Sequence, residues 1–113
     1  MNARERLIAA INHCTPDRAP VDLGSTTATG MAVSTMANFR DYLGLKKRPI
    51  KAFEPFQMLG EVDEDLREIV GSDCVGLWSR STWFGYKNIN YKKWTMPDGL
   101  EVLVGEGFQV DYD

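Results

Sequence analysis

The most constraining feature of this chain is a turn signal at residues 96–99, Met-Pro-Asp-Gly, between two runs that favour strands. Residues 91–95 and 100–104 flank the turn and are alternating or rich in β-forming side chains. Pro97 fixes the φ angle that suits the first central position of a turn, and Gly99 can adopt a positive φ. Together these features predict a β-hairpin that any fold of the chain has to accommodate.

The chain opens with a predicted helix and a proline-bounded turn. Asn2 and Glu5 have the spacing of a capping box, and apolar residues then recur at helical spacing as far as about His13. Residues 15–20 contain two prolines, which exclude helix there. The run 21–23 that follows is a candidate strand.

Two further helices are predicted downstream. Residues 24–30 are small, polar and bounded by glycines, which is typical of a loop leaving a strand. Residues 32–43 carry an apolar stripe, and Gly44 is placed to end this second helix. A third helix is predicted from Pro55 to about Gly71. Its expected buried stripe consists of Met58, Leu59, Val62, Leu66 and Ile69.

The order of the elements predicts an α/β fold. Residues 74–78 form a continuous apolar run, typical of a strand buried on both faces of a parallel sheet. A long, mainly helical stretch separates this run from residues 21–23, which favours a crossover and a parallel pair, as at the opening of an α/β barrel. Such a pair is incomplete alone, so residues 1–113 are expected to be the N-terminal part of a longer single domain. The alternative is a small α+β domain completed by oligomerisation.

The composition argues against several functional classes. Thirteen basic against sixteen acidic side chains give a net charge of −3, and the longest basic run is residues 46–48, so no nucleic-acid partner is expected. No apolar stretch approaches the roughly 20 residues of a membrane span, and the start is not a signal peptide, which predicts a cytoplasmic protein without a membrane partner. Cys14 and Cys74 lie far apart without a CxxC pair, so neither a disulfide framework nor a metal site is predicted in this segment.

Several segments together resemble the N-terminal third of uroporphyrinogen decarboxylase-like proteins, a family of decarboxylases and corrinoid methyltransferases. The segments are residues 2–7 (Asn-Ala-Arg-Glu-Arg-Leu), 16–21 (Pro-Asp-Arg-Ala-Pro-Val), 55–59 (Pro-Phe-Gln-Met-Leu), 83–86 (Trp-Phe-Gly-Tyr) and 94–99 (Trp-Thr-Met-Pro-Asp-Gly). The resemblance spans essentially the whole chain. Because the family fold is a (β/α)₈ TIM-type barrel, it implies that later βα units lie beyond Asp113 and that the β-hairpin is an insertion.

Two departures from the family pattern favour its methyltransferase branch. The decarboxylases carry an arginine-rich stretch after the first strand that grips substrate carboxylates, whereas residues 23–30 here contain no arginine. They also place an aspartate after the second strand to accept hydrogen bonds from pyrrole N–H groups, where this chain offers Arg80, which has no acceptor. The resemblance thus implies a corrinoid-dependent methyltransferase that uses zinc and a corrinoid (cobalamin), with a corrinoid protein as partner. Its zinc ligands, a His-x-Cys pair and another Cys, would lie beyond Asp113.

Two other functions stay open at this point. One is a uroporphyrinogen decarboxylase of tetrapyrrole biosynthesis that acts without a cofactor. The other is a non-catalytic binding module in which the hairpin and the aromatic residues form a docking surface. A small-molecule substrate is expected for either enzyme, the catalytic residues are not identified, and a homo-oligomer is left open.

The candidate substrate-binding residues follow the two predicted strands, because barrel enzymes place reactive groups at the C-terminal ends of their strands. They are Asp22, Ser25, Thr26 and Thr27 after the first strand, and Ser79, Arg80 and Trp83 after the second. Asp22 either orients a ligand or caps backbone N–H groups, which is the commoner role beside hydroxyl-rich turns. Arg80 either binds a carboxylate or phosphate or is a solvated loop side chain. The aromatic side chains at residues 78, 83, 84 and 86 favour a core or an interface over a ligand pocket, and Trp83 is the exception most expected to line a pocket.

Overall fold

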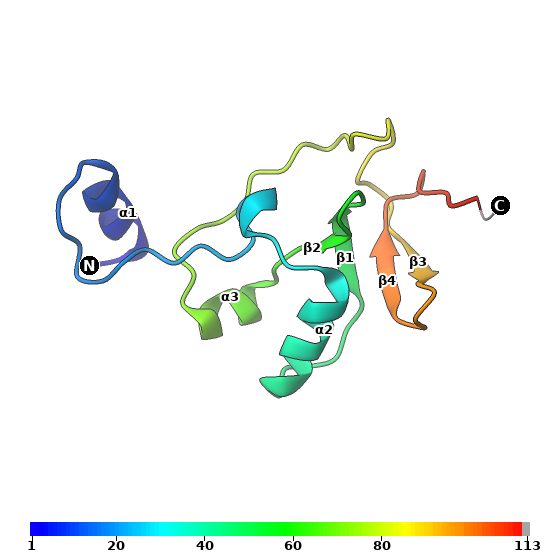
Figure 1. Cartoon of the computed structure of the whole chain (residues 1–113), viewed down its shortest axis with the longest axis horizontal. Helices are drawn as coiled ribbons and strands as arrows, with labels where there is room; N and C mark the ends of the chain where they lie inside the picture. Colours follow the sequence, from blue (N-terminus) through cyan, green and yellow to red (C-terminus); the bar gives the residue numbers. More distant parts are fainter. Residues whose placement is uncertain (112–113) are drawn as a thin grey trace. The chain divides into compact units, whose positions relative to one another are not determined.

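The computed structural model of the chain describes residues 1–111 and contains both α-helices and β-strands (Figure 1). The chain divides into two compact units, one made of Met1–Gly30 and Val62–Leu77 and the other of Met31–Glu61 and Trp78–Asp113. All the strands of the described residues belong to one open, mixed sheet of four strands in the second unit. The prediction that the chain contains both helices and a β-sheet is confirmed. Among residues 1–111, no helix has the length and apolar character needed to cross a membrane.

Helix α1 (Ala3–Ile11) forms as its capping signals predict. The Glu5 backbone N–H donates to Asn2 Oδ1 at 2.9 Å, and the Asn2 N–H donates to Glu5 Oε2 at 2.9 Å, which completes the capping box. The helix ends before His13, whose φ of 56° is left-handed. The N–H of Cys14 then bonds to the carbonyl of Ala9 at 2.9 Å, a closure typical of a Schellman motif.

Helix α3 (Glu64–Val70) begins nine residues after Pro55, so the predicted start of the third helix is wrong. Gly60 disfavours a helix interior, because glycine costs about 1 kcal/mol relative to alanine there. The Glu54 carboxylate accepts the N–H groups of Phe56 and Gln57 at 2.9 and 2.8 Å, which folds this stretch into a turn instead. The predicted end is confirmed, since Gly71 caps α3 with a φ of 71°.

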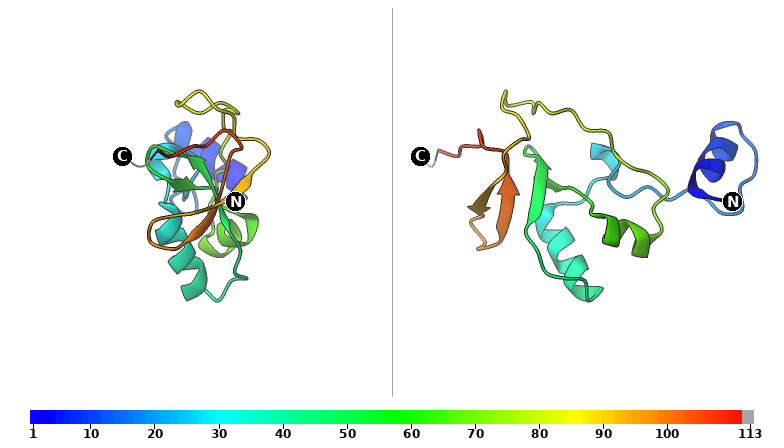
Figure 2. Two further views of the ribbon diagram at one scale, coloured as in Figure 1. Left: turned by 90° about the vertical axis from the view of Figure 1, so that its right-hand side faces the viewer. Right: turned by 180° about the vertical axis from the view of Figure 1, so that it is seen from behind.

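The sheet of the second unit has the strand order β2-β1-β4-β3 (Figure 1). Its strands are β1 (Ile50–Glu54), β2 (Leu59–Gly60), β3 (Lys92–Thr95) and β4 (Glu101–Val104). Strands β1 and β4 are parallel, with Ile50 opposite Val102, whereas β1–β2 and β3–β4 are antiparallel. The last pair is the predicted hairpin (Figure 2), closed by Gly99 with a φ of 88°.

Helix α2 (Val33–Tyr42) covers β1 and β2, and its buried Val33 and Met36 belong to the core of the second unit. The other buried apolar side chains of this unit are Ile50, Ala52, Phe53, Leu59, Val102, Val104 and Phe108. Gly60 lies so close to Met36 that a Cβ at this position would stand 3.0 Å from the sulfur. The missing side chain therefore lets α2 approach the sheet closely.

The two strands predicted at residues 21–23 and 74–78 are absent from the structure. Side chains rather than a partner strand take the backbone N–H groups of the first run: Asp73 Oδ2 accepts from Val21 at 2.9 Å, and Ser72 Oγ accepts from Leu23 at 3.2 Å. In the second run Leu77 is 97% exposed, so it is not buried on both faces. The parallel pair of the fold is β1 with β4 instead.

Candidate functional site

A network of four charged residues organises the first unit. The guanidinium of Arg6, on α1, donates to both oxygens of Asp17, from Nε at 2.7 Å and from Nη2 at 2.9 Å, and its Nη1 donates to Asp73. Arg18 reaches the same Asp73 carboxylate with two N–H groups at 2.8 and 3.1 Å. The side chains of Arg6 and Asp73 are buried, whereas those of Asp17 and Arg18 are partly exposed. Buried charges of this kind are stable only when they are paired and fully hydrogen-bonded, as these are.

The network shifts the pKa values of its members. The hydrogen bond from Arg6 holds the pKa of Asp17 well below its usual range. The pKa of Asp73 is also lowered, first by the backbone N–H of Val21 and then by Arg18 and Arg6. The pKa of Arg6 is raised, chiefly by its hydrogen bond to Asp17. Both carboxylates are therefore ionised at neutral pH.

Asp73 also holds the segment of the first predicted site residues in place. The Val21 N–H donates to Asp73 Oδ2 at 2.9 Å, and the Asp73 N–H donates to the Val21 carbonyl at 2.7 Å. Val21 and Asp73 are thus joined by two hydrogen bonds although they are far apart in sequence. Asp22, the next residue after Val21, is positioned by this pair.

Asp22 closes the loop of residues 24–30 on itself. Its carboxylate accepts hydrogen bonds from the Ser25 N–H at 3.0 Å, from the Ser25 hydroxyl and from the Thr29 hydroxyl at 3.2 Å. Gly24 adopts a φ of 77°, and a Cβ there would lie 2.3 Å from Val62 Cγ2, so only glycine fits this bend. The capping role considered for Asp22 is therefore the one that the structure shows.

Two of the predicted residues, Thr26 and Thr27, lie at the start of a short 3₁₀ helix, η1 (Thr27–Thr29). The Thr26 N–H donates to Thr29 Oγ1 at 3.1 Å, and the Thr29 N–H donates to Thr26 Oγ1 at 3.3 Å. Both Thr26 and Thr27 are exposed. The sequence prediction missed Thr29, which the capping-box spacing from Thr26 would have indicated.

Cys74 directly follows Asp73 and carries a thiol in the first unit. Its thiol is half-buried, and burial raises its pKa, with the negative charges of Asp22 and Asp73 adding to the effect. A thiol with a raised pKa is a poor nucleophile at neutral pH. Over residues 1–111, no three His, Cys, Asp or Glu side chains gather as they would around a metal ion.

The residues predicted after the second strand lie on a folded-back loop of the second unit. The Asn88 N–H donates to the Arg80 carbonyl at 2.7 Å, and the Thr82 N–H donates to the Tyr86 carbonyl at 2.8 Å. This places Trp83 at the tip, where it is 97% exposed and not in a pocket wall. Ser79 and Arg80 are also exposed, and the Ser79 hydroxyl accepts from the N–H of Ser81 at 3.1 Å.

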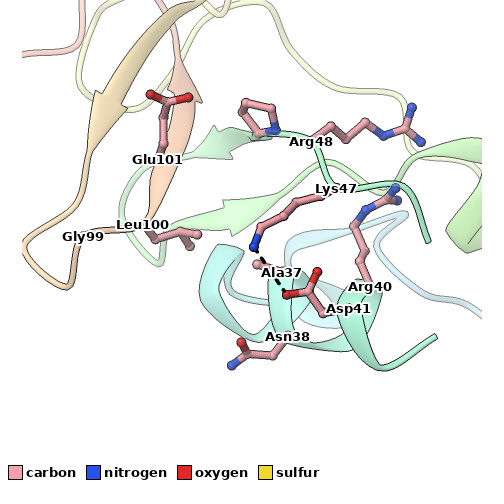
Figure 3. A pocket seen from close by; sticks show the side chains of 10 residues that line it. Ala37, Asn38, Arg40, Asp41, Lys47, Arg48, Gly99, Leu100 and Glu101 are labelled. Carbon is pink, nitrogen blue, oxygen red and sulfur yellow. Dashed lines mark ion pairs between the residues drawn. The ribbon is translucent and has the colours of Figure 1, made fainter. Parts of the chain in front are cut away.

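A cleft of about 470 Å³ in the second unit is lined by none of the predicted site residues (Figure 3). Its walls come from α2, from residues 47–49 and from the hairpin turn at residues 99–101. Lys47 points toward Asp41 across 4.0 Å, and Glu101 pairs with Lys93 at 3.2 Å. Arg40 and Arg48 also line the cleft, so its walls carry three cationic side chains beside the two carboxylates of Asp41 and Glu101.

No protein-family model, curated protein or solved structure matches the chain significantly.

We expect the network around Asp73 to make the protein sensitive to acid. Because the folded-state pKa values of Asp17 and Asp73 lie below their unfolded values, the stabilisation is complete above about pH 4 and is lost as the pH falls further. Asp73→Asn should lower the free energy of unfolding at pH 7 and flatten its decline in acid, as measured by urea denaturation across pH 2–7. Glu68→Gln, at an exposed carboxylate on α3, is the matched control. Parallel pH profiles for Asp73→Asn and the unmutated protein would contradict the network.

A second prediction separates the capping role of Asp22 from ligand binding. Asp22→Ala removes three hydrogen bonds of the loop and should cost about 1–3 kcal/mol in the free energy of unfolding. Thr27→Ala, at an exposed neighbour, should change it by no more than about 0.5 kcal/mol. Chemical denaturation measures both. Equal stabilities of the two variants would favour a ligand-binding carboxylate over a structural one.

Proposed function

We propose that this chain is the N-terminal part of a uroporphyrinogen decarboxylase-like barrel enzyme that transfers methyl groups to or from a corrinoid protein. The observation that carries the proposal is the network centred on Asp73. It joins two of the segments by which the chain resembles the family, residues 2–7 through Arg6 and residues 16–21 through Asp17 and Arg18. The hydrogen bonds of the network therefore hold these two segments together in the folded protein.

The network also brings residues 21–23 beside residues 72–74, although neither run is a strand in the structure. Within this proposal, further βα units of the enzyme would cover the exposed Val75 and Leu77.

The chemistry of the loop after residues 21–23 favours methyl transfer over tetrapyrrole decarboxylation. A substrate with several carboxylates calls for cationic side chains, and residues 22–30 contain none. The loop offers Asp22, whose oxygens are already engaged by Ser25 and Thr29. A methyl acceptor thiol does not require that cationic lining.

The zinc-bound thiolate of such an enzyme would be held outside this segment. Zinc lowers the pKa of a bound thiol and so supplies a nucleophile at neutral pH. Within residues 1–111, no three His, Cys, Asp or Glu side chains gather as zinc ligands would. We therefore assign this chain to the scaffold and to the first loops of the substrate site.

The test is a methyl-transfer assay on the full-length protein that contains this chain. We expect bound zinc by metal analysis and transfer of the methyl group from methylcobalamin to a thiol such as 2-mercaptoethanol, followed by the absorbance change of the corrinoid. Cys14→Ser and Cys74→Ser should keep both zinc and activity, since neither thiol is assigned to the metal.

Absence of zinc together with absence of methyl transfer would overturn the proposal. The same preparation should leave uroporphyrinogen unchanged. Release of carbon dioxide from uroporphyrinogen would establish the decarboxylase instead.

A further inference from the structure

A second cavity, of about 390 Å³, lies in the second unit and is built from segments that follow its two parallel strands. Pro55 comes directly after β1, and residues 107–109 and Asp111 come after β4. Phe84 and Tyr86, from the folded-back loop, complete the lining. None of these residues lines the cleft beside α2, so the two cavities are distinct.

Three of the side chains that line this cavity are aromatic. The Tyr86 ring meets the ring of Phe108 edge-on, with centroids 6.1 Å apart. A Cβ at Gly107 would lie 2.6 Å from the Cβ of Tyr86, so the glycine lets the backbone close on this side chain. Phe108 is buried, whereas Phe84 is 62% exposed and leaves much of its ring open to a ligand. The aromatic lining therefore combines a packed pair with one accessible ring.

The charge on the cavity lining is negative. Asp111 contributes a carboxylate, and no lysine, arginine or histidine is among the lining residues. Asp111 is exposed, and no hydrogen bond or ion pair joins its carboxylate to another residue within 1–111. Burial and then the charge of Glu54 raise the pKa of Tyr86, which indicates a second carboxylate close to the lining. A ligand that fits this charge is a cation.

A carboxylate beside aromatic rings suits an organic cation better than a metal ion. A hard metal ion such as Ca²⁺ requires several oxygen ligands, and no three His, Cys, Asp or Glu side chains within residues 1–111 gather as such ligands. Aromatic rings attract an ammonium group, and the methyl substituents of a quaternary ammonium also pack against them. A primary ammonium has three N–H donors to satisfy, whereas a quaternary one has none, so a single carboxylate suffices for it.

We propose that this cavity binds a small methylated ammonium compound, with the positive charge beside the Asp111 carboxylate and the methyl groups against the aromatic lining at Phe84. The negative charge of the lining selects for a cation, and the aromatic side chains select for an organic one. Because Asp111 and Phe84 are exposed to solvent, binding is weak and depends on the salt concentration. This site is independent of zinc and of methyl transfer.

The test is titration of the intact protein with choline, followed by NMR chemical shifts. The matched probe is the uncharged alcohol in which a tert-butyl group replaces the trimethylammonium group of choline. We expect choline to bind about tenfold more tightly than this alcohol, because the carboxylate and the rings both attract the positive charge. Added salt should weaken the binding of choline and not that of the alcohol. Failure of choline to bind, or equal affinities of the two compounds, would overturn the proposal.

Two carboxylates of the same segment separate the role of Asp111 from that of net charge. Asp111→Asn should weaken choline binding by about threefold or more and leave binding of the alcohol unchanged. Glu106→Gln makes the same change in net charge at an exposed residue outside the cavity, and should leave choline binding unchanged. Equal affinities of the Asp111→Asn and Glu106→Gln variants for choline would overturn the proposal.

The two neighbouring aromatic residues of the loop tip provide a second matched pair. Phe84→Ala removes a ring from the cavity lining and should weaken choline binding, whereas Trp83→Ala, at a residue that does not line the cavity, should leave it unchanged. Vesicles of phosphatidylcholine carry the same trimethylammonium group on a lipid, and the protein should not bind to them. Binding to the vesicles without binding to choline would overturn a site for a small molecule.

Discussion

The Asp73 carboxylate is the constraint on which the first unit depends. It accepts hydrogen bonds from Arg6, from Arg18 and from the Val21 backbone, so α1, the proline-bounded turn and residues 21–23 converge on one buried charge. A buried carboxylate is tolerated only when its oxygens accept hydrogen bonds from such partners. Loss of any partner leaves part of the negative charge uncompensated in the protein interior, where the dielectric constant is low. The position of the Asp22 loop follows from this convergence rather than from a β-ladder.

The elements that the sequence predicted correctly have local causes. Asn2 and Glu5 determine where α1 begins, and Pro97 with Gly99 determines the hairpin turn, because each signal acts within a few residues. The predicted strand at residues 21–23 failed for a non-local reason. A strand requires backbone acceptors from a neighbouring segment, and here side chains from residues 72 and 73 take that place.

One contact among the predicted site residues has a local cause. Asp22 bonds to Ser25 because an aspartate followed by hydroxyl residues bonds within its own turn. Trp83 was expected in a pocket, yet the folded-back loop carries it into solvent, while its neighbour Phe84 and Tyr86 line a cavity. Aromatic character alone does not tell which ring of a cluster faces inward. The Tyr86 hydroxyl is buried and has no hydrogen-bond partner within residues 1–111, and Gly105 and Gly107 pack closely against the Tyr86 side chain. No sequence pattern predicts this packing.

Amide hydrogen exchange at Val21 and Asp73 is the most direct test of the central claim that the Asp73 network holds residues 21–23 beside residues 72–74. The two amides donate to Asp73 Oδ2 and to the Val21 carbonyl, so we predict that both exchange much more slowly than the amide of exposed Trp83. Exchange of both at the rate of the Trp83 amide would mean that the two segments are not held together and would contradict the account.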